Sequence, residues 1–126
     1  MIEVPVAWGE LVDKITILEI KSERIADPAK LANVRAELHL LRERLGSVEA
    51  DPAVSRLHAA LRQVNETLWR IEDDIRDCER DGDFGAKFVE LARSVYRTND
   101  RRAELKREIN LALGSAILEE KSYKPY

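Results

Sequence analysis

Apolar residues between positions 54 and 78 recur in an unbroken alternation of three-residue and four-residue steps. The positions are Val54, Leu57, Leu61, Val64, Leu68, Ile71, Ile75 and Cys78. This spacing is a heptad repeat, which places every apolar side chain on one narrow stripe of an α-helix. The stripe would stay in water unless other helices covered it. The sequence therefore predicts an all-α fold held together by packing of helix on helix.

The length and composition fit one folded domain. A chain of 126 residues can bury roughly two thirds of the surface that it exposes when unfolded. A hydrophobic fraction of 44% beside a charged fraction of 36% is typical of amphipathic helices rather than of a disordered chain. The net charge of -3 argues against nucleic acid as a partner, because neutralising phosphates requires an excess of Lys and Arg. We expect a single helical domain over residues 1–126.

Helix boundaries are marked by glycines and by two Asp-Pro pairs, at residues 27–28 and 51–52. Each pair combines an N-cap carboxylate with a proline at the first helical position. The helices are expected at residues 8–26, 28–45, 52–80 and 84–113. Short connections favour antiparallel neighbours, so we expect an antiparallel bundle of about four helices with a long, heptad-patterned helical hairpin. Residues 1–7 and 115–126 are expected to form short extended ends.

The cysteine content and the N-terminal sequence bear on the cellular compartment. Cys78 is the only cysteine, and its heptad position predicts a small buried residue in a reducing compartment. Glu3 stands where a secretory signal would need basic residues. No apolar run in the sequence approaches the roughly 18 residues of a membrane-spanning helix. We therefore expect a cytoplasmic protein without membrane insertion.

Polar residues interrupt the apolar stripe of the last expected helix. Asn99 lies at heptad spacing from Val95, and a hairpin centred on Gly82 would place Asn65 level with Asn99. The same construction brings Ser22 of the first helix near that level. Such a polar layer would fix the register of the helices, or it would line a pocket between them. Simple exposure of both asparagines is a third alternative.

A second stripe beside the heptad positions carries Asn65, Trp69, Glu72 and Arg76. Trp69 either widens the buried arc or meets another chain. Glu72 and Arg76 stand at i,i+4 in the favourable order, and we expect a solvated ion pair. Arginines also recur every four residues from Arg93, but acidic residues are interleaved. This mixture favours a solvated face and leaves an anionic ligand as the alternative.

No catalytic or metal-binding motif is visible in the sequence. His39 and His58 stand on different expected helices, and neither has further ligands at metal-binding spacing. Nucleophile motifs, phosphate-binding glycine loops and cysteine pairs are also absent from the sequence. We expect no metal and no cofactor, and the sequence favours a protein that is not an enzyme without excluding one. Asp13 and Glu19 stand out on the first helix, where ion pairing with Lys14 or with cations of the last helix is favoured over catalysis.

Four strings in the chain resemble an uncharacterised bacterial all-helical family, one of the numbered domains of unknown function. The strings are GELVDKITILEIK (9–21), NETLWRIEDDIR (65–76), VYRTNDRRAELKREIN (95–110) and EEKSY (119–123). The resemblance covers nearly the whole chain and implies no activity. Similar segments occur in proteins with glycosyltransferase-like or helical-repeat regions, which implies a link to bacterial surface-polysaccharide or glycosyltransferase systems.

These observations give a set of candidate binding residues and two functions. The residues are Asp13, Lys14, Asn65, Trp69, Glu72, Arg76, Asn99, Arg102 and Lys106. The first function is a non-enzymatic helical scaffold or interaction module. It would form a homo-oligomer, with a dimer favoured, or bind a bacterial protein partner. The reason is that narrow heptad stripes are hard to cover within one short chain. The second is a small anionic-metabolite-binding protein or enzyme with a polar site between helices, similar to the all-helical chorismate mutases in architecture but in no motif.

Overall fold

The computed structural model describes residues 1–114 and 122–126. The elements are α1 (Trp8–Arg24), α2 (Pro28–Leu45), the 3₁₀ helix η1 (Gly46–Ala50), α3 (Pro52–Asp81) and α4 (Ala86–Ala112). The described part of the chain contains helices and no strand, so the expected all-α bundle with a long hairpin is confirmed. Residues 1–7 and 122–126 have no regular secondary structure. The rest of the expected C-terminal extended end, residues 115–121, lies outside the described residues.

The Asp-Pro pairs start helices as the sequence indicates. The Asp27 carboxylate accepts a hydrogen bond from the backbone N–H of Ala29 at 2.9 Å, at the start of α2. Asp51 accepts one from Ala53 at 2.8 Å, at the start of α3. Each carboxylate satisfies a backbone donor that has no partner inside its helix. At the other end of α3, Gly82 takes the left-handed conformation (φ 66°) that ends the helix sharply.

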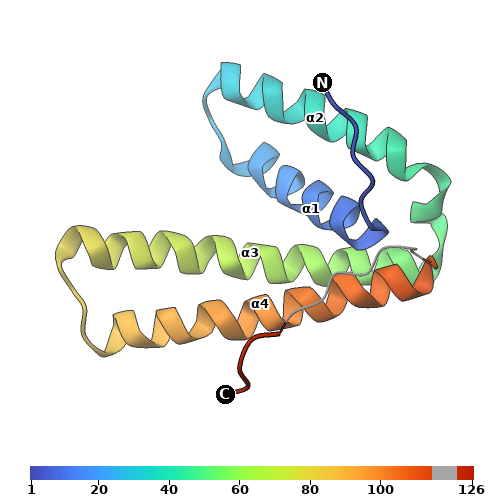
Figure 1. The fold of residues 1–126 in the computed structure, drawn as a ribbon. Coiled ribbons are helices and arrows are strands. Elements are labelled where there is room, and N and C mark those ends of the chain that lie inside the picture. Colours follow the sequence, from blue (N-terminus) through green and yellow to red (C-terminus); the bar gives the residue numbers. More distant parts are fainter. Residues whose placement is uncertain (115–121) are drawn as a thin grey trace.

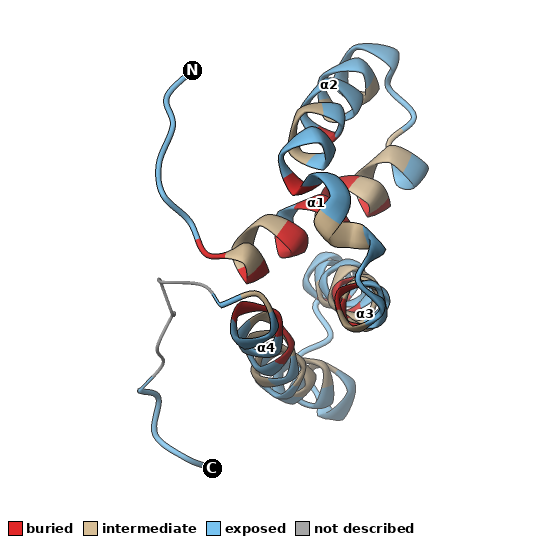
Figure 2. Cartoon of the chain, turned by 90° about the vertical axis from the view of Figure 1, so that its right-hand side faces the viewer, coloured by how far each residue is buried: buried red, intermediate tan, exposed pale blue. Residues whose placement is uncertain are grey.

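The helices form three layers (Figure 1). The α3–α4 hairpin is the base, α1 lies across one half of it, and α2 lies on the far side of α1. Figure 2 shows α1 between α2 and the hairpin. The covered half of the hairpin, residues 52–67 of α3 and 98–112 of α4, carries α1. The projecting half, residues 68–81 and 86–97, extends beyond α1. Among the described residues, α1 borders only its start, and the C-terminal residues border Val95 and Tyr96.

The main hydrophobic core lies where α1 covers the hairpin. Its buried members are Val12, Ile15, Leu18, Leu38, Leu45, Leu57, Leu61, Leu105 and Ile109. α1 contributes from a wide apolar arc and also buries Asp13 and Thr16, as expected for the helix at the centre of the molecule. Burial of each large aliphatic side chain contributes about 1.5–3 kcal/mol.

α1 and α4 touch through their backbones at Gly9. The Gly9 N–H donates to the side-chain oxygen of Asn110 at 2.7 Å. A Cβ atom at position 9 would lie only 2.3 Å from the carbonyl oxygen of Lys106. A larger residue would therefore push the two helices apart, and glycine is required for this approach.

The hairpin turn differs from the sequence expectation and changes the helix register. Residues 82–85 all lie between the two helices, so α4 begins at Ala86 rather than at residue 84. Compared with a hairpin centred on Gly82, each residue of α3 therefore lies beside an α4 residue about three positions further along the chain. This shift is nearly one helical turn. Asn65 therefore lies level with Arg102 instead of Asn99. α1 also ends at Arg24, before residue 26, because Ile25 is extended.

Candidate functional site

A buried carboxylate connects three helices below the centre of α1. Asp13 of α1 is 1% exposed. Arg102 of α4 binds it with two nitrogens, Nε donating to Oδ1 at 2.9 Å and a terminal nitrogen donating to Oδ2. Asn65 of α3 donates from Nδ2 to the same Oδ1 at 2.9 Å. A charge this deep in the fold is tolerated only when it is paired and hydrogen-bonded in this way.

Thr16 fixes the orientation of Asn65. The Thr16 hydroxyl donates to the Asp13 carbonyl at 2.7 Å and accepts from Asn65 Nδ2 at 2.8 Å. The Asp13 carboxylate can only accept, and the Thr16 hydroxyl already donates its proton to the Asp13 carbonyl, so the Asn65 amide cannot be turned over. Its oxygen Oδ1 consequently points away from the network and has no hydrogen-bond partner among the described residues. Every fully buried side-chain polar atom of the described residues has a hydrogen-bond partner. The Asn65 oxygen has none among these residues, so it must be accessible to solvent.

Asn65 and Arg102 also line an open groove beside α1, which we call the α1–α3 groove. It has a volume of about 470 Å³. Its lining residues are Ile17, Ile20, Asn65, Leu68, Trp69, Glu72, Asp73, Arg76 and Arg102. The Arg24 guanidinium lies 5.8 Å from the centre of the Trp69 ring, a cation–π distance. The groove therefore combines an apolar wall with a mixed polar rim at the start of the projecting half.

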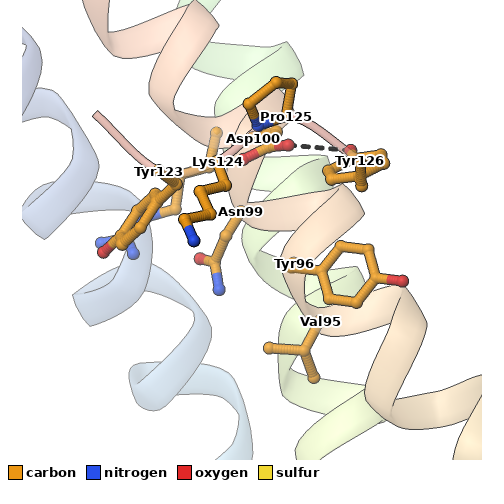
Figure 3. A pocket seen from close by; sticks show the side chains of 9 residues that line it. Val95, Tyr96, Asn99, Asp100, Tyr123, Lys124, Pro125 and Tyr126 are labelled. Atoms are coloured by element: carbon orange, nitrogen blue, oxygen red, sulfur yellow. Dashed lines mark hydrogen bonds between the residues drawn. The ribbon is translucent and has the colours of Figure 1, made fainter. Parts of the chain in front are cut away.

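A second groove lies along α4 where the C-terminal residues return to it (Figure 3). It is lined by Val95, Tyr96, Asn99, Asp100, Arg102, Tyr123, Lys124, Pro125 and Tyr126, with a volume of about 870 Å³. The Tyr126 hydroxyl donates to Asp100 at 2.8 Å, and the rings of Tyr126 and Tyr96 are 5.0 Å apart. Arg102 thus borders both grooves, whereas Asn99 faces only this tail groove.

A histidine cluster links α1, η1 and α3. The Nε2 atom of His58 lies 2.9 Å from Glu19, and its Nδ1 atom lies 3.0 Å from Glu49. Arg42 of α2 donates to the same Glu19 carboxylate at 2.9 Å. The hydrogen bond with Glu19 is the main cause that raises the pKa of His58. Burial alone would raise the pKa of Glu19, but the bonds from His58 and Arg42 outweigh it and lower that pKa.

This cluster was not recognised from the sequence, because its members are far apart in the chain and share no spacing. Two carboxylates on the two ring nitrogens favour the doubly protonated imidazolium form of His58. Within the described residues no group of three or more His, Cys, Asp or Glu side chains is arranged to hold a metal ion. The cluster therefore acts as an ion-paired connection between helices.

The candidate residues from the sequence fall into five places. Asp13, Asn65 and Arg102 form the buried network. Trp69, Glu72 and Arg76 join Asn65 and Arg102 in the α1–α3 groove. Asn99 lies in the tail groove. Lys106 donates to Glu10 at 2.6 Å at the start of α1, and Lys14 makes an exposed ion pair with Glu37 at 3.4 Å.

Two further expectations are settled by these contacts. The prediction that Asn65 faces Asn99 is wrong, because the longer turn brings Arg102 to the level of Asn65. Ser22 does not join the layer either, since its hydroxyl donates to the Glu19 carbonyl at 2.6 Å. A polar layer exists, but Asp13, Thr16 and Arg102 complete it.

The charges of this region are largely balanced. The Arg102 guanidinium is opposed by Asp13, and Arg76 lies 3.7 Å from Glu72 in the solvated i,i+4 pair that the sequence indicates. The row of arginines on α4 is likewise paired, since Arg93 and Arg97 both contact Glu90 at 3.3 Å. Such an arrangement fixes helix register well. It offers no concentrated positive field for an anionic ligand.

Comparison with protein families gives one match. A family of unknown function (DUF6165) matches the chain over residues 2–126, which confirms the resemblance seen in the four sequence strings. Comparisons with curated proteins and with solved structures give no match. Among the described residues, no helix combines the length and the apolar character needed to cross a membrane.

Proposed function

We propose that this chain, which belongs to the DUF6165 family of unknown function, is a non-enzymatic helical interaction module that self-associates as a dimer. The projecting half of the α3–α4 hairpin is the interaction surface. One observation carries the proposal: a single heptad stripe runs the length of α3, and α1 covers only one half of it.

Burial along the stripe changes where α1 ends. In the covered half, Leu57 is 8% exposed and Leu61 is fully buried. In the projecting half, burial alternates along the stripe: Ile71 and Cys78 are buried, whereas Leu68 and Ile75 are only half-buried. Three apolar side chains of α4 in the projecting half are also incompletely covered; they are Phe88, Leu91 and Val95. Two helices enclose the seam between them only in part, so the half-buried side chains leave apolar surface that a partner could cover.

The projecting half and its turn also carry large apolar groups that are partly exposed to water. Phe84 at the turn is 55% exposed, Val89 is 52% exposed and Tyr96 is 41% exposed. Exposed apolar groups that gather on one part of a surface are typical of interaction sites. These residues lie on the same part of the molecule as the half-buried seam, so one partner could cover both.

The charges of the two hairpin helices favour a second copy as that partner. α3 has seven acidic residues and five arginines, whereas α4 has seven Lys or Arg residues and four acidic residues. A two-fold axis across the hairpins would bring the start of α4 in each copy to α3 of the other, with opposite charges facing. The same surface would then serve both copies, as in most dimers.

We also propose the cellular setting that the family resemblance implies. The module would act in the cytoplasm beside a bacterial protein of a surface-polysaccharide or glycosyltransferase system, and the support for this is the four sequence strings alone. Deleting the gene should reduce surface polysaccharide. The wild-type gene should restore it and a dimer-deficient variant should not; unchanged polysaccharide after deletion would contradict this setting.

The dimer is tested by light scattering coupled to size-exclusion chromatography at micromolar concentrations. The expected mass is twice the 14.4 kDa of one chain. Val89→Glu, in the projecting half, should give a monomer, because it places a charge in the interface. Leu111→Glu is the matched control, since Leu111 is equally exposed (61%) but lies at the other end of α4. A wild-type chain that remains a monomer at about 100 micromolar protein would contradict the proposal.

A small anionic metabolite in the α1–α3 groove is the second candidate, supported by Asn65, Arg76 and Arg102 in its lining. It is the weaker one, because Glu72 and Asp13 already oppose both arginines. A thermal-shift screen with carboxylate and phosphate metabolites separates the two. A melting temperature raised by one compound, and no longer raised in Arg76→Ala, would favour this candidate.

A further inference from the structure

We infer that the α1–α3 groove of one copy receives the hairpin tip of the second copy. The hairpin tip is the segment of residues 82–88, which joins α3 to α4. The inference rests on the proposed self-association and goes further by naming the two surfaces that meet.

The groove selects an occupant that has both an apolar group and a hydrogen-bond donor. Its wall is apolar, formed by Ile17, Ile20, Leu68 and Trp69. Its polar side offers acceptors: the Asn65 oxygen, whose orientation is fixed and which has no partner among the described residues, and the nearby carboxylates of α3.

Charge pairing leaves one of these carboxylates available. Arg102 is neutralised by Asp13, and Glu72 is paired with Arg76. The Asp73 carboxylate makes no ion pair with any residue in the described ranges. An ammonium or guanidinium group entering the groove would thus meet Asp73 and the Asn65 oxygen together.

The hairpin tip presents this combination of groups. The Phe84 ring is 55% exposed and packs edge-on against Phe88 at 5.4 Å between ring centres. Lys87 is exposed and has no ion-pair partner in the part of the chain that the structure describes. Two aromatic rings and one ammonium group match an apolar wall beside a free carboxylate.

The tip is also held in one conformation before binding. Gly82 adopts its left-handed conformation, and the Asp83 carboxylate accepts a hydrogen bond from the Gly85 N–H at 3.1 Å. A pre-formed segment loses little conformational entropy when it binds. The tip is therefore suited to dock as a rigid group.

The spacing of tip and groove permits both contacts at once. From Trp69 to Asp81, the end of α3, the helix rises about 18 Å at ~1.5 Å per residue. A two-fold axis perpendicular to the hairpin, near Ile75, would bring each tip to the groove of the other copy. Ile75 would then meet its own counterpart at the axis, and the half-buried seam between the grooves would be covered. The interface closes on itself and leaves no groove or tip free.

A charge swap tests this arrangement. Asp73→Lys places two cations together at each contact, and Lys87→Glu places two anions together. Each single variant should dimerise at least tenfold more weakly than the wild-type chain, measured by sedimentation equilibrium. The double variant Asp73→Lys/Lys87→Glu should dimerise within about threefold of wild type. Asp74→Lys is the matched control, because Asp74 is a neighbouring exposed acid that does not line the groove.

Mixing the two single variants gives the sharpest result. In a heterodimer of Asp73→Lys with Lys87→Glu, one contact is native and the other is reversed, so both pair opposite charges. The mixture should therefore form heterodimers near the wild-type affinity although neither variant forms homodimers at that concentration. Wild-type dimers that are insensitive to both substitutions would overturn the inference and leave the proposed function standing. A monomeric wild-type chain would overturn both.

Tryptophan fluorescence reports directly on occupancy of the groove. The chain has two tryptophans, so Trp8→Phe leaves Trp69 as the only one. Its emission should shift to shorter wavelength as the protein concentration passes the dimerisation range, and Phe84→Ala should abolish the shift. A dimer whose Trp69 emission does not change on association would show that the tip lies elsewhere and would overturn the inference.

Discussion

The two halves of the α3–α4 hairpin have the same heptad pattern and different surroundings. In the covered half, α1 lies on the seam and the apolar side chains are shielded from water. In the projecting half, Leu68 and Ile75 continue the stripe but stay half-buried, although Ile71 and Cys78 between them and after them are buried. The comparison teaches that a heptad pattern specifies that a stripe must be covered, and does not specify by which chain.

The polar groups of the two halves differ in the same way. In the covered half, Asp13, Asn65 and Arg102 bind one another, so the layer stabilises one register. In the projecting half, Lys87 and Asp73 form no ion pair among the described residues. Polar groups that are satisfied internally serve the fold, whereas those that remain available can serve recognition.

The largest expected effect comes from the buried network. Asp13→Ala removes the carboxylate that neutralises Arg102 and accepts from Asn65, so the free energy of unfolding should fall by about 3–5 kcal/mol. Urea denaturation followed by circular dichroism measures this loss. The neighbouring Lys14→Ala removes an exposed ion pair and should cost less than about 1 kcal/mol. Equal losses for the two variants would show that the network does not hold the covered half together.

A pair of leucine truncations compares the halves directly. Leu61→Ala empties a fully buried site and should lower the free energy of unfolding by about 2–5 kcal/mol at any protein concentration. Leu68→Ala, two heptad positions further along the same stripe, should cost about 1 kcal/mol at concentrations where the chain is monomeric.

The Leu68→Ala loss should grow at higher concentrations, because the dimer buries that side chain. Thermal melts over a hundredfold range of protein concentration test this dependence. A loss for Leu68→Ala that matches Leu61→Ala in dilute solution would mean that the projecting half is already covered in the monomer.

A smaller effect concerns the pH dependence of the covered half. The pKa of His58 is raised in the folded chain, so its contribution is complete below its ordinary pKa of 6.5 and is lost as the pH rises through the raised value. The pKa of Glu19 is lowered, so its contribution is complete above 4.5 and is lost as the pH falls through the lowered value. Stability from this cluster should therefore be greatest between these two ordinary values.

Urea midpoints at a series of pH values check this expectation. The wild-type chain should lose about 1 kcal/mol or less on going from the optimum to alkaline pH. His58→Gln should remove this part of the dependence, because glutamine does not titrate between Glu19 and Glu49. A pH profile unchanged by that substitution would show that the cluster does not stabilise the fold.

Much of the fold could be predicted from the sequence because its signals are local. Heptad spacing identified the long hairpin, and the two Asp-Pro pairs identified the starts of α2 and α3. The details of the polar layer could not be predicted, because they depend on the turn. Four residues between the hairpin helices, rather than a turn centred on one glycine, moved Asn65 to the level of Arg102.

The rest of the candidate site depends on how α1 crosses the hairpin. Thr16 enters the network only because α1 lies directly over Asn65. His58 meets Glu19 for the same reason, and no spacing along the chain reveals either contact. Sequence patterns identified several residues of the groove, such as Trp69 and Arg76, but the crossing geometry was needed to show that they lie together.

Hydrogen exchange at two protein concentrations tests the central claim most directly. Backbone amides of residues 68–97 should become more protected when the concentration is raised through the dimerisation range, while those of residues 9–15 and 103–110, which do not line the groove, stay unchanged. Protection of residues 68–97 that is already complete in dilute solution, or that does not change with concentration, would contradict the claim that a second copy covers the projecting half.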